Sequence, residues 1–347
     1  MGRSTMRLAS GRSSCCERVT GVRIERDIAK VPAQPRSIAI GTFDGVHVGH
    51  QRVIGAAVVA ARGRDITATV LTFDHHPRAV VEPTRQPRLL TPPAAKEELI
   101  AGLGVDELVV LHFDAALAAL PAERFCRDVL RRALDARVVA VGENFTFGAR
   151  GAGTADTLAA CGADGGFETV VVPLLTADGR PISSSRIRRL LHEGRLPEVR
   201  DILGRPPRTV GLVVHGDKRG RTLGFPTANI DAHTGLIFPG RGVYAARVRL
   251  HGAWYRAAVN VGHNPTFLHK GDDEAVVRIE AYLLDFAGDA YGALLMVDFL
   301  AKLRDEERFP SPEALVARMH DDIARTAVLD DPAYDEVGLG GRHAARA

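Results

Sequence analysis

Short runs of β-branched and other apolar residues alternate with longer Ala- and Leu-rich segments through the first half of the chain. This alternation is typical of βαβ units, in which a buried parallel strand is followed by a helix that covers the sheet. The predicted strands are residues 37–40, 67–73, 107–112, 137–141 and 169–172. The predicted helices between them are residues 52–62, 94–103, 121–134 and 154–161. The first half is therefore expected to be a doubly wound α/β domain.

The pattern changes after residue 195. Leu203-Gly204-Arg205-Pro206-Pro207 interrupts the chain, and strand-like segments then follow one another without intervening helices. The strands expected here are residues 209–214, 242–250, 254–261, 275–284 and 293–300, with a closing helix at 312–329. This order predicts an antiparallel β-barrel that ends in a helix.

The two patterns divide the 347 residues into two cores, which is ordinary for a chain of this length. Residues 1–22, rich in Arg, Ser and Gly, are expected to be a disordered extension. The expected remainder is an α/β domain at 23–195, a linker at 196–208, a barrel domain at 209–335 and a tail at 336–347.

Composition narrows the class of protein. A content of 46% hydrophobic and 25% charged residues is that of a globular protein, and a net charge of +3 suits small anionic substrates better than nucleic acid. The four cysteines lack the spacing of a zinc site or a disulfide framework, which indicates free thiols and a reducing compartment. No apolar stretch has the length of a membrane span or signal peptide. We therefore expect a cytoplasmic protein with neither a nucleic-acid nor a membrane partner.

A glycine-rich segment, Gly41-Thr-Phe-Asp-Gly-Val-His-Val-Gly-His50, joins the first predicted strand to the first predicted helix. Ligands of open α/β sheets bind at this edge, and the start of the following helix offers N–H donors to phosphate. His47 and His50 would face the same side and could stabilise charge on phosphate oxygens during displacement at the α-phosphorus of ATP. The glycines that would admit a closely approaching ligand are Gly41, Gly45 and Gly49.

Two other interpretations of this segment compete with a phosphate site. A strand-to-helix turn that is rich in glycine can be no more than a tight turn. A zinc site is the second alternative, and its ligands would be His47, His50, His75 and His76. The absence of a cysteine or a suitably spaced acidic ligand disfavours zinc.

Glycines and cationic side chains are concentrated again in residues 211–229. Such a segment can surround a polyphosphate with donors, although the chain has neither a P-loop nor the protein-kinase motifs. Thr227 and Asn229, two residues apart, would face the same way on an extended strand and offer oxygen ligands to Mg²⁺. A surface turn after Pro226 would contain the same residues.

Glu280 interrupts an otherwise apolar predicted strand. An unpaired carboxylate is costly to bury, so this side chain needs either a partner or a chemical role. The candidate partners are Arg278 and Arg247.

In their order along the chain, these segments resemble the motifs of prokaryotic bifunctional riboflavin kinase/FAD synthetases (FMN adenylyltransferases). Residues 41–50 resemble the His-x-Gly-His signature of the nucleotidyltransferase superfamily, and residues 211–229 resemble the flavokinase signature Gly-x-Pro-Thr-Ala-Asn. Further similar segments are residues 72–77, 141–148, 182–188, 242–244, 260–267, 278–286 and 303–309. The sequence departs from the family at His75, where proline is usual, and at Ser185, where threonine is usual.

The resemblance implies a nucleotidyltransferase-like α/β domain followed by a flavokinase barrel, and two reactions. The second domain would phosphorylate riboflavin with ATP to give FMN, and the first would adenylylate FMN with a second ATP to give FAD and pyrophosphate. The implied cofactor is Mg²⁺, ATP is the co-substrate, and FMN and FAD are substrate or products.

The resemblance also implies site residues. Glu280 would be the base for the ribityl hydroxyl, His47 and His50 would act in adenylyl transfer, and Thr227 and Asn229 would hold the metal. In the first domain the implied nucleotide- and flavin-binding residues are Gly41, Phe43, Asp44, Gly45, Gly49, His76, Pro77, Asn144, Ser184, Ser185 and Arg186. In the second they are Gly211, His215, Gly216, Arg221, Gly224, Pro226, Asn260 and Arg304.

Several alternatives remain open at the level of sequence. Ser183 or Ser184 would also make a good helix cap. Arg186 or Arg188 could be solvated helix charges. Arg304 could belong to an exposed charge run. Flavin stacking and core packing both explain Phe145, Phe147 and Phe267. For the whole chain, the alternatives are a kinase whose adenylyltransferase half is inactive or uses another substrate, and a flavin-sensing protein without catalysis.

Overall fold

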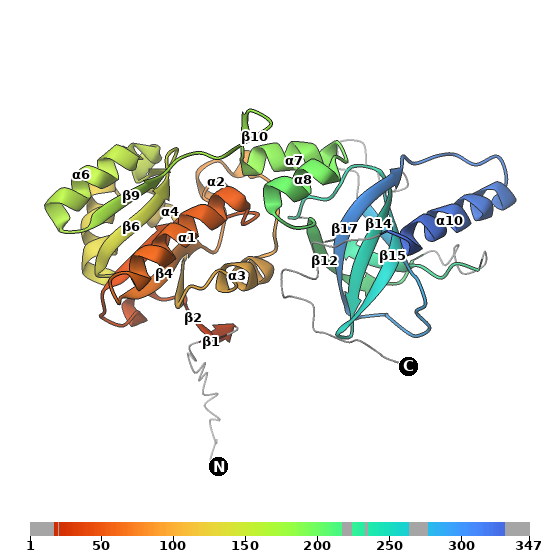
Figure 1. Cartoon of the computed structure of the whole chain (residues 1–347), viewed down its shortest axis with the longest axis horizontal. Coiled ribbons are helices and arrows are strands. Elements are labelled where there is room, and N and C mark those ends of the chain that lie inside the picture. The colour runs from red at the N-terminus through yellow and green to blue at the C-terminus, as the bar shows by residue number, and fades with distance from the viewer. Residues whose placement is uncertain (1–16, 20, 217–223, 233–234, 264–276, 330–347) are drawn as a thin grey trace, which may run out of the picture.

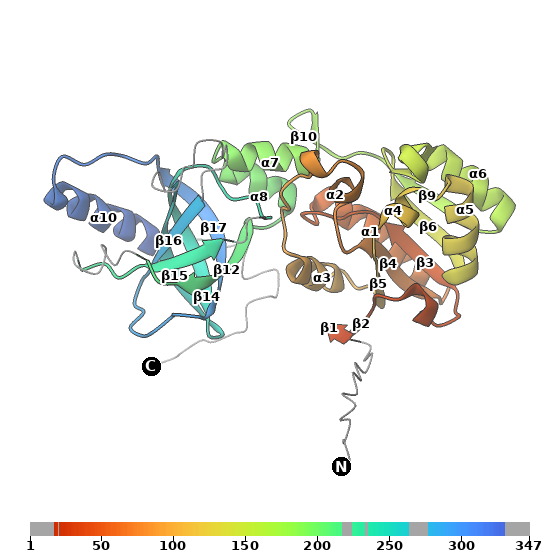
Figure 2. The same cartoon turned by 180° about the vertical axis from the view of Figure 1, so that it is seen from behind.

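The computed structural model describes residues 17–19, 21–216, 224–232, 235–263 and 277–329. Figures 1 and 2 show two modules side by side, with helices α7 (Ser184–His192) and α8 (Leu196–Leu203) between them. Within the described residues, no helix combines the length and the apolar character needed to span a bilayer.

The amino-terminal module is built on a seven-stranded sheet of order β1-β2-β5-β4-β3-β6-β9. Its parallel strands are β2 (Val22–Glu25), β5 (Glu107–Leu111), β4 (Thr67–Phe73), β3 (Arg36–Ile40), β6 (Ala136–Gly142) and β9 (Glu168–Val172). Every residue of β3 and β5 is buried, as expected of a parallel sheet covered on both faces. The predicted α/β architecture is confirmed.

Helices cover this sheet and short elements connect it. The helices are α1 (Val48–Arg62), α2 (Arg78–Val81), α3 (Pro93–Ala101), α4 (Ala115–Ala118), α5 (Ala122–Arg124) and α6 (Ala155–Gly165). Single 3₁₀ turns lie at Ile28–Lys30, Pro83–Arg85 and Ala149–Gly151. Two small hairpins consist of two-residue strands. Strand β7 (Thr146–Phe147) pairs with β8 (Gly153–Thr154), and β10 (Thr176–Ala177) pairs with β11 (Arg180–Pro181). The helix expected at 121–134 instead begins as α5 and continues as a π-helix over Phe125–Ala133.

The expectation of disorder through residue 22 is wrong at its carboxyl end. Strand β1 (Glu17–Val19) pairs with β2, and β2 in turn pairs with β5 at the edge of the sheet. The alternating apolar residues Val22 and Ile24 are buried there, which is the physical reason for the order.

The expected linker at 196–208 contains helix α8. Pro197 stands in its first turn, where proline is tolerated, and the helix ends at Gly204, which has a left-handed conformation. Its apolar residues recur at helical spacing and are buried: Leu196, Val199, Ile202 and Leu203. The segment therefore packs as structure between the modules.

The carboxyl-terminal module is a closed barrel of order β12-β13-β16-β15-β14-β17, as predicted. All its strand pairs are antiparallel. The strands are β12 (Arg208–Val214), β13 (Ala228–Ala232), β14 (Gly242–Leu250), β15 (Ala253–His263), β16 (Val277–Leu283) and β17 (Leu294–Arg304). Helix α10 (Pro312–Ala327) follows, capped by the Ser311 side chain, which accepts a hydrogen bond from the Ala314 N–H. Strand β13 was not predicted.

One hydrophobic core joins the modules. Buried residues of α7 and α8, including Ile187 and Val199, pack in the same cluster as barrel residues such as Tyr244 and Phe299. The backbone of Leu89 adds two hydrogen bonds across this junction, to Gly235 at 2.8 Å and to Ile237 at 3.0 Å. The modules therefore share a packed interior.

Candidate active sites

The loop before α1 has an unusual backbone. Phe43 and Val46 have φ angles of 50° and 40°, and Gly45 between them has a φ of 90°. A β-carbon at Gly41 would lie 2.9 Å from the Phe43 ring, and one at Gly49 would lie 3.2 Å from the His47 ring. A side chain at either position would therefore crowd the ring beside it, and glycine avoids this contact.

His47 caps α1. Its Nδ1 accepts a hydrogen bond from the His50 N–H at 3.2 Å, and the two imidazole rings stack with centroids 3.5 Å apart. Burial lowers the pKa of His47 to about 4 and holds the pKa of His50 well below its ordinary value, with the charge of Arg205 acting in the same direction. Both rings are therefore neutral near pH 7. Because Nδ1 of His47 is an acceptor, its ring proton is on Nε2.

Asp44 ties this loop to α7. Its carboxylate accepts the Leu90 N–H at 2.9 Å and forms an ion pair with Arg188, while its carbonyl accepts the Ser184 hydroxyl at 2.9 Å. Burial raises the pKa of Asp44, although Arg188 and the backbone hydrogen bonds act against this. The contacts fix the start of α7 against the loop.

A cavity of about 810 Å³ opens over this loop. The predicted residues that line it are Gly41, Phe43, Asp44, His47, Gly49, His50, His76, Pro77, Asn144, Ser184 and Ser185. Phe145 and Phe147 also line it, with their rings stacked 5.5 Å apart. The motifs of four separate segments thus meet in one cavity.

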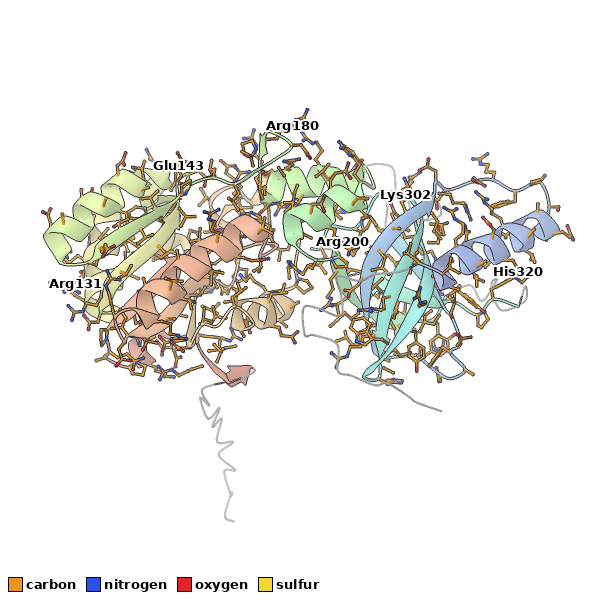
Figure 3. All side chains as sticks on the ribbon, viewed as in Figure 1. Arg131, Glu143, Arg180, Arg200, Lys302 and His320 are labelled. Atoms are coloured by element: carbon orange, nitrogen blue, oxygen red, sulfur yellow. The ribbon has the colours of Figure 1, made fainter. Side chains whose placement is uncertain are left out.

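Two predicted residues do not line this cavity. Gly45 serves the loop conformation instead, with its positive φ. Arg186 donates to the carbonyl oxygens of Ala177 at 2.8 Å and Arg180 at 3.0 Å, on the hairpin where Figure 3 labels Arg180. Arg188, which the sequence left as a helix charge, lines the cavity.

The alternatives for α7 are settled by its contacts. Ser183 is the helix cap, and its hydroxyl accepts the Arg186 N–H at 3.2 Å. The side chains of Arg186 and Arg188 are only 10% and 15% exposed, so the interpretation of solvated helix charges is wrong.

The zinc interpretation of four histidines is not supported. In the part of the chain that the structure describes, the only close group of potential metal ligands is Asp74, His75 and His112, which includes neither His47 nor His50. His76 instead lines the cavity over the 41–50 loop, where burial lowers its pKa to about 4.

Sequence reasoning missed Arg205. This partly buried side chain donates to the carbonyl oxygens of Gly45 at 2.7 Å and Val46 at 3.3 Å, and thereby supports the loop that precedes α1. Its Gly-Arg-Pro-Pro context was interpreted only as an interruption between domains.

Most predicted residues of the second module line two cavities, and Thr227 lines both. One, of about 810 Å³, is lined by barrel and α10 residues, among them Thr227, Asn260, Glu280 and Arg304. The other, of about 610 Å³, is lined by Gly216, Pro226, Thr227 and Asn229. Figure 3 places α10, marked by His320, beside the barrel.

Glu280 has the partner that its position requires. Its carboxylate pairs with Arg278 at 2.9 Å, and Arg278 also donates to Asn229 Oδ1 at 3.3 Å. Asn229 and Glu280 stand opposite each other in the β13–β16 register. The side chain of Glu280 is 29% exposed and lines the cavity, so its ion pair with Arg278 does not bury the carboxylate.

Arg304 is not part of an exposed charge run. Its guanidinium pairs with Asp322 of α10 at 2.9 Å, and the two side chains are only 9% and 4% exposed. It also lies over the Phe309 ring at 5.5 Å. The exposed-charge interpretation is therefore wrong for this residue.

Three predicted residues of this module lie outside both cavities. Gly211 allows close strand pairing, since a β-carbon there would lie 2.5 Å from the Asp231 carbonyl oxygen. The His215 ring packs against the Tyr291 ring, with their centroids 4.0 Å apart. Gly224 has a positive φ of 88°. Arg221 and Phe267 lie outside the described residues. The cavity residues that sequence reasoning missed include Arg241, Tyr282, Leu315 and Met319.

The fold and the cavities of its two modules define the class of protein as a two-module nucleotide-dependent transferase. Family models match residues 30–186, described as FAD synthetase, and residues 203–329, described as riboflavin kinase. The chain belongs to the bifunctional riboflavin kinase/FMN adenylyltransferase family. It forms FMN from riboflavin in its second module and FAD from FMN in its first, with ATP as co-substrate.

Similar proteins agree with this assignment. The bifunctional riboflavin kinase/FMN adenylyltransferase of Listeria monocytogenes is 40% identical to this chain, over 82% of this chain and 89% of that protein. The protein of the same name from Bacillus subtilis is 37% identical, over 83% of this chain and 91% of that protein. A solved structure described as a macrolide-efflux protein from Streptococcus pneumoniae matches with a TM-score of 0.79 at 32% identity, over 88% of this chain and 99% of that one.

Proposed function

We propose that the cavity over the 41–50 loop is the adenylyltransferase site and that His47 and His50 act there on ATP. The observation that carries this proposal is the stacked, neutral pair of imidazoles at the start of α1. A neutral His47 donates from Nε2, and the helix start adds backbone donors. These groups stabilise the negative charge that develops as an FMN phosphate oxygen attacks the α-phosphorus and pyrophosphate leaves.

Other lining residues complete the adenylyltransferase site. Asn144, Ser184 and Ser185 offer neutral polar groups to nucleotide or flavin, and His76 lies at the same cavity. The stacked rings of Phe145 and Phe147 present aromatic surface for the isoalloxazine ring. The arrangement supplies positioning and charge stabilisation, which dominate phosphoryl-type transfers.

In the kinase site, Glu280 accepts the proton of the ribityl 5′-hydroxyl as that oxygen attacks the γ-phosphorus of ATP. Its position on the cavity wall beside Arg278 supports this role, because the cation orients the carboxylate. Asn260 and Arg304 line the same cavity and bind substrate or product there.

Thr227 and Asn229 are suited to Mg²⁺. Both line one cavity and carry uncharged oxygen donors of the kind this ion takes alongside substrate phosphates. When bound, Mg²⁺ neutralises charge on the ATP phosphates.

The compartment proposed for the protein is the cytoplasm. Cys126 and Cys161 are unbridged, as a reducing environment predicts. With a net charge of +3 and small anionic substrates, no nucleic-acid partner is proposed.

The assignment is tested by supplying riboflavin, ATP and Mg²⁺ and separating flavins over time. Wild type is expected to give FMN and then FAD. Glu280→Gln abolishes FMN formation but leaves FAD formation from supplied FMN, and His50→Ala does the reverse. The exposed His192→Ala serves as the matched control. Loss of both activities in either folded variant would contradict the two-site assignment.

A further inference from the structure

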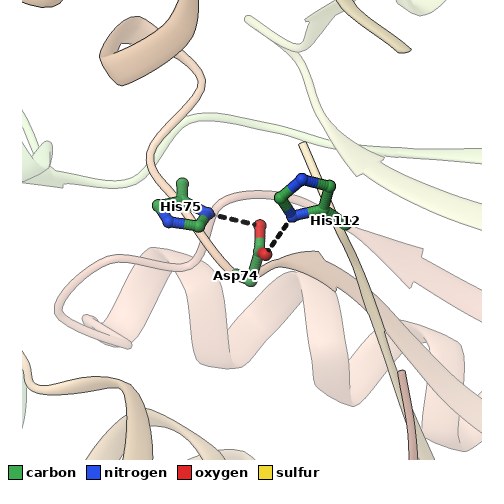
Figure 4. Close-up of side chains that lie close together, drawn as sticks. All are labelled: Asp74, His75 and His112. Atoms are coloured by element: carbon green, nitrogen blue, oxygen red, sulfur yellow. Dashed lines mark hydrogen bonds and ion pairs between the residues drawn. The ribbon is translucent and has the colours of Figure 1, made fainter. Parts of the chain in front are cut away.

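Asp74, His75 and His112 bring three potential metal ligands together outside both active-site cavities. One ligand atom from each lies within 4.8 Å of the other two. Figure 4 shows the Asp74 carboxylate between the two imidazole rings. Nδ1 of His75 lies 2.8 Å from Asp74 Oδ1, and Nδ1 of His112 lies 2.6 Å from Oδ2.

The backbone holds this cluster in place. Strands β4 and β5 are parallel neighbours with Phe73 opposite Leu111, so the residues after their ends emerge side by side. The Asp74 N–H donates to the Leu111 carbonyl at 3.0 Å, and the Phe113 N–H donates to Asp74 Oδ1 at 3.0 Å. The central carboxylate is thus fixed by the sheet before any ligand arrives.

The donor set selects a class of ion. Two imidazole nitrogens and one carboxylate oxygen suit Zn²⁺ and related transition metals, whereas Mg²⁺ favours oxygen ligands and retained water. The Asp74, His75 and His112 side chains are 33%, 56% and 67% exposed, which leaves room for an ion to enter and for water to complete its coordination.

We propose that Asp74, His75 and His112 bind one divalent transition-metal cation of the zinc class, with water as a further ligand. Metal–ligand bonds to nitrogen and oxygen are about 2.0–2.2 Å long, so the ion replaces the protons shared in the two hydrogen bonds after small shifts of the rings. The site is distinct from the proposed Mg²⁺ site in the barrel. It lies next to the adenylyltransferase cavity, because His76 directly follows His75 and lines that cavity.

Because of His75, the proposed metal site would be specific to this chain and not shared by the family segment that it resembles. His75 stands where the similar family segment has proline, and proline offers no metal ligand. The substitution His75→Pro therefore removes one ligand while restoring the residue usual at that position, and it leaves the proposed catalytic histidines in place.

The test is calorimetric titration of the chelator-treated full chain with Zn²⁺, without ATP because ATP itself binds the ion. Wild type is expected to bind one Zn²⁺, and His75→Pro and His112→Ala each to weaken binding by about tenfold or more. His192→Ala retains wild-type affinity, and FAD formation from FMN with Mg²⁺ confirms that each variant is folded. Absence of Zn²⁺ binding by wild type, or wild-type affinity in either ligand variant, would overturn the proposal and leave the cluster as a hydrogen-bonded group.

Discussion

Arg205 donates a hydrogen bond from Nη2 to the carbonyl oxygen of Gly45 at 2.7 Å, across 160 residues of sequence. Its Nη1 reaches the carbonyl oxygens of Val46 at 3.3 Å and Leu203 at 3.2 Å. Burial and the neighbouring Arg208 lower the pKa of Arg205 to about 10, which still leaves it charged at neutral pH. A residue at the start of the kinase module thereby holds the backbone of the adenylyltransferase loop.

Arg205→Met should impair FAD formation more than FMN formation. The change removes the donor to the Gly45 carbonyl oxygen, while the Val46 and Leu203 carbonyl oxygens keep their bonds from Gln51 Nε2. Loss of such a bond costs about 1–3 kcal/mol, and it loosens the loop that carries His47. Steady-state rates of both reactions measure the effect. Arg195→Met is the control, because the Arg195 side chain is 51% exposed and pairs with Glu198 at the surface. An equal loss of both activities would contradict the positioning role.

Acid should destabilise the amino-terminal module partly through His47. Its pKa in the folded state is about 4, against about 6.5 for an unfolded histidine. As pH falls from 6.5 towards 4, the unfolded chain binds the proton first, so stability falls by about 1.4 kcal/mol per pH unit. Above pH 6.5 both states are neutral and this contribution is absent.

His47→Asn isolates that contribution, because asparagine keeps a capping acceptor but does not titrate. The melting temperature of the variant should fall less between pH 7 and pH 5 than that of wild type. His192→Ala should retain the wild-type slope. Parallel pH profiles for His47→Asn and wild type would show that His47 does not carry this dependence.

Glu107→Gln should destabilise the α/β module without changing its chemistry. Glu107 pairs with Arg36 at 2.6 Å, both side chains are fully buried, and they lie at the amino ends of their strands, opposite the cavity. Removing one charge of such a pair costs about 3–5 kcal/mol. Thermal unfolding measures the loss, and the KM values of the variant at low temperature should remain those of wild type.

Asp322→Ala should damage riboflavin phosphorylation while FAD formation from supplied FMN continues. The substitution leaves Arg304 without its buried partner and loosens α10 against the barrel. The expected result is a raised KM for riboflavin together with lower stability of the barrel module. Asp321→Ala is the matched control, because its ion pair with Arg318 is exposed. An unchanged KM for riboflavin in Asp322→Ala would argue against this role for α10.

Strand positions could be predicted wherever burial imposes a continuous apolar run. Strands β4 and β14 begin and end at the predicted residues. Strand β13 was missed because Ala228 and Asn229 belong to a segment dominated by turn-forming and polar residues, and only pairing with β12 and β16 makes it a strand. Helix α8 was missed because Pro197 and Gly204 suggested a linker, whereas Pro197 lies in its first turn and Gly204 follows its end.

For the candidate sites, too, local motifs predicted some residues, while contacts between distant segments determined others. Most residues predicted from motif order line shared cavities, and in the first module this follows because the carboxyl ends of parallel strands meet at one edge. Arg205 and the Asp44–Arg188 ion pair depend on contacts between distant segments, which no local pattern encodes. Arg186 does not line the cavity as its neighbours do, because its guanidinium turns back to the β10–β11 hairpin.

Helices α7 and α8 share their apolar core with the barrel, and this limits how the chain can be dissected. The FAD synthetase match ends at residue 186, within α7. A fragment cut there would lose Leu190 and Leu191, and one that continued through α8 would expose the face that the barrel covers. Exchanging either module for another would therefore require a partner whose surface fits the same shared interior.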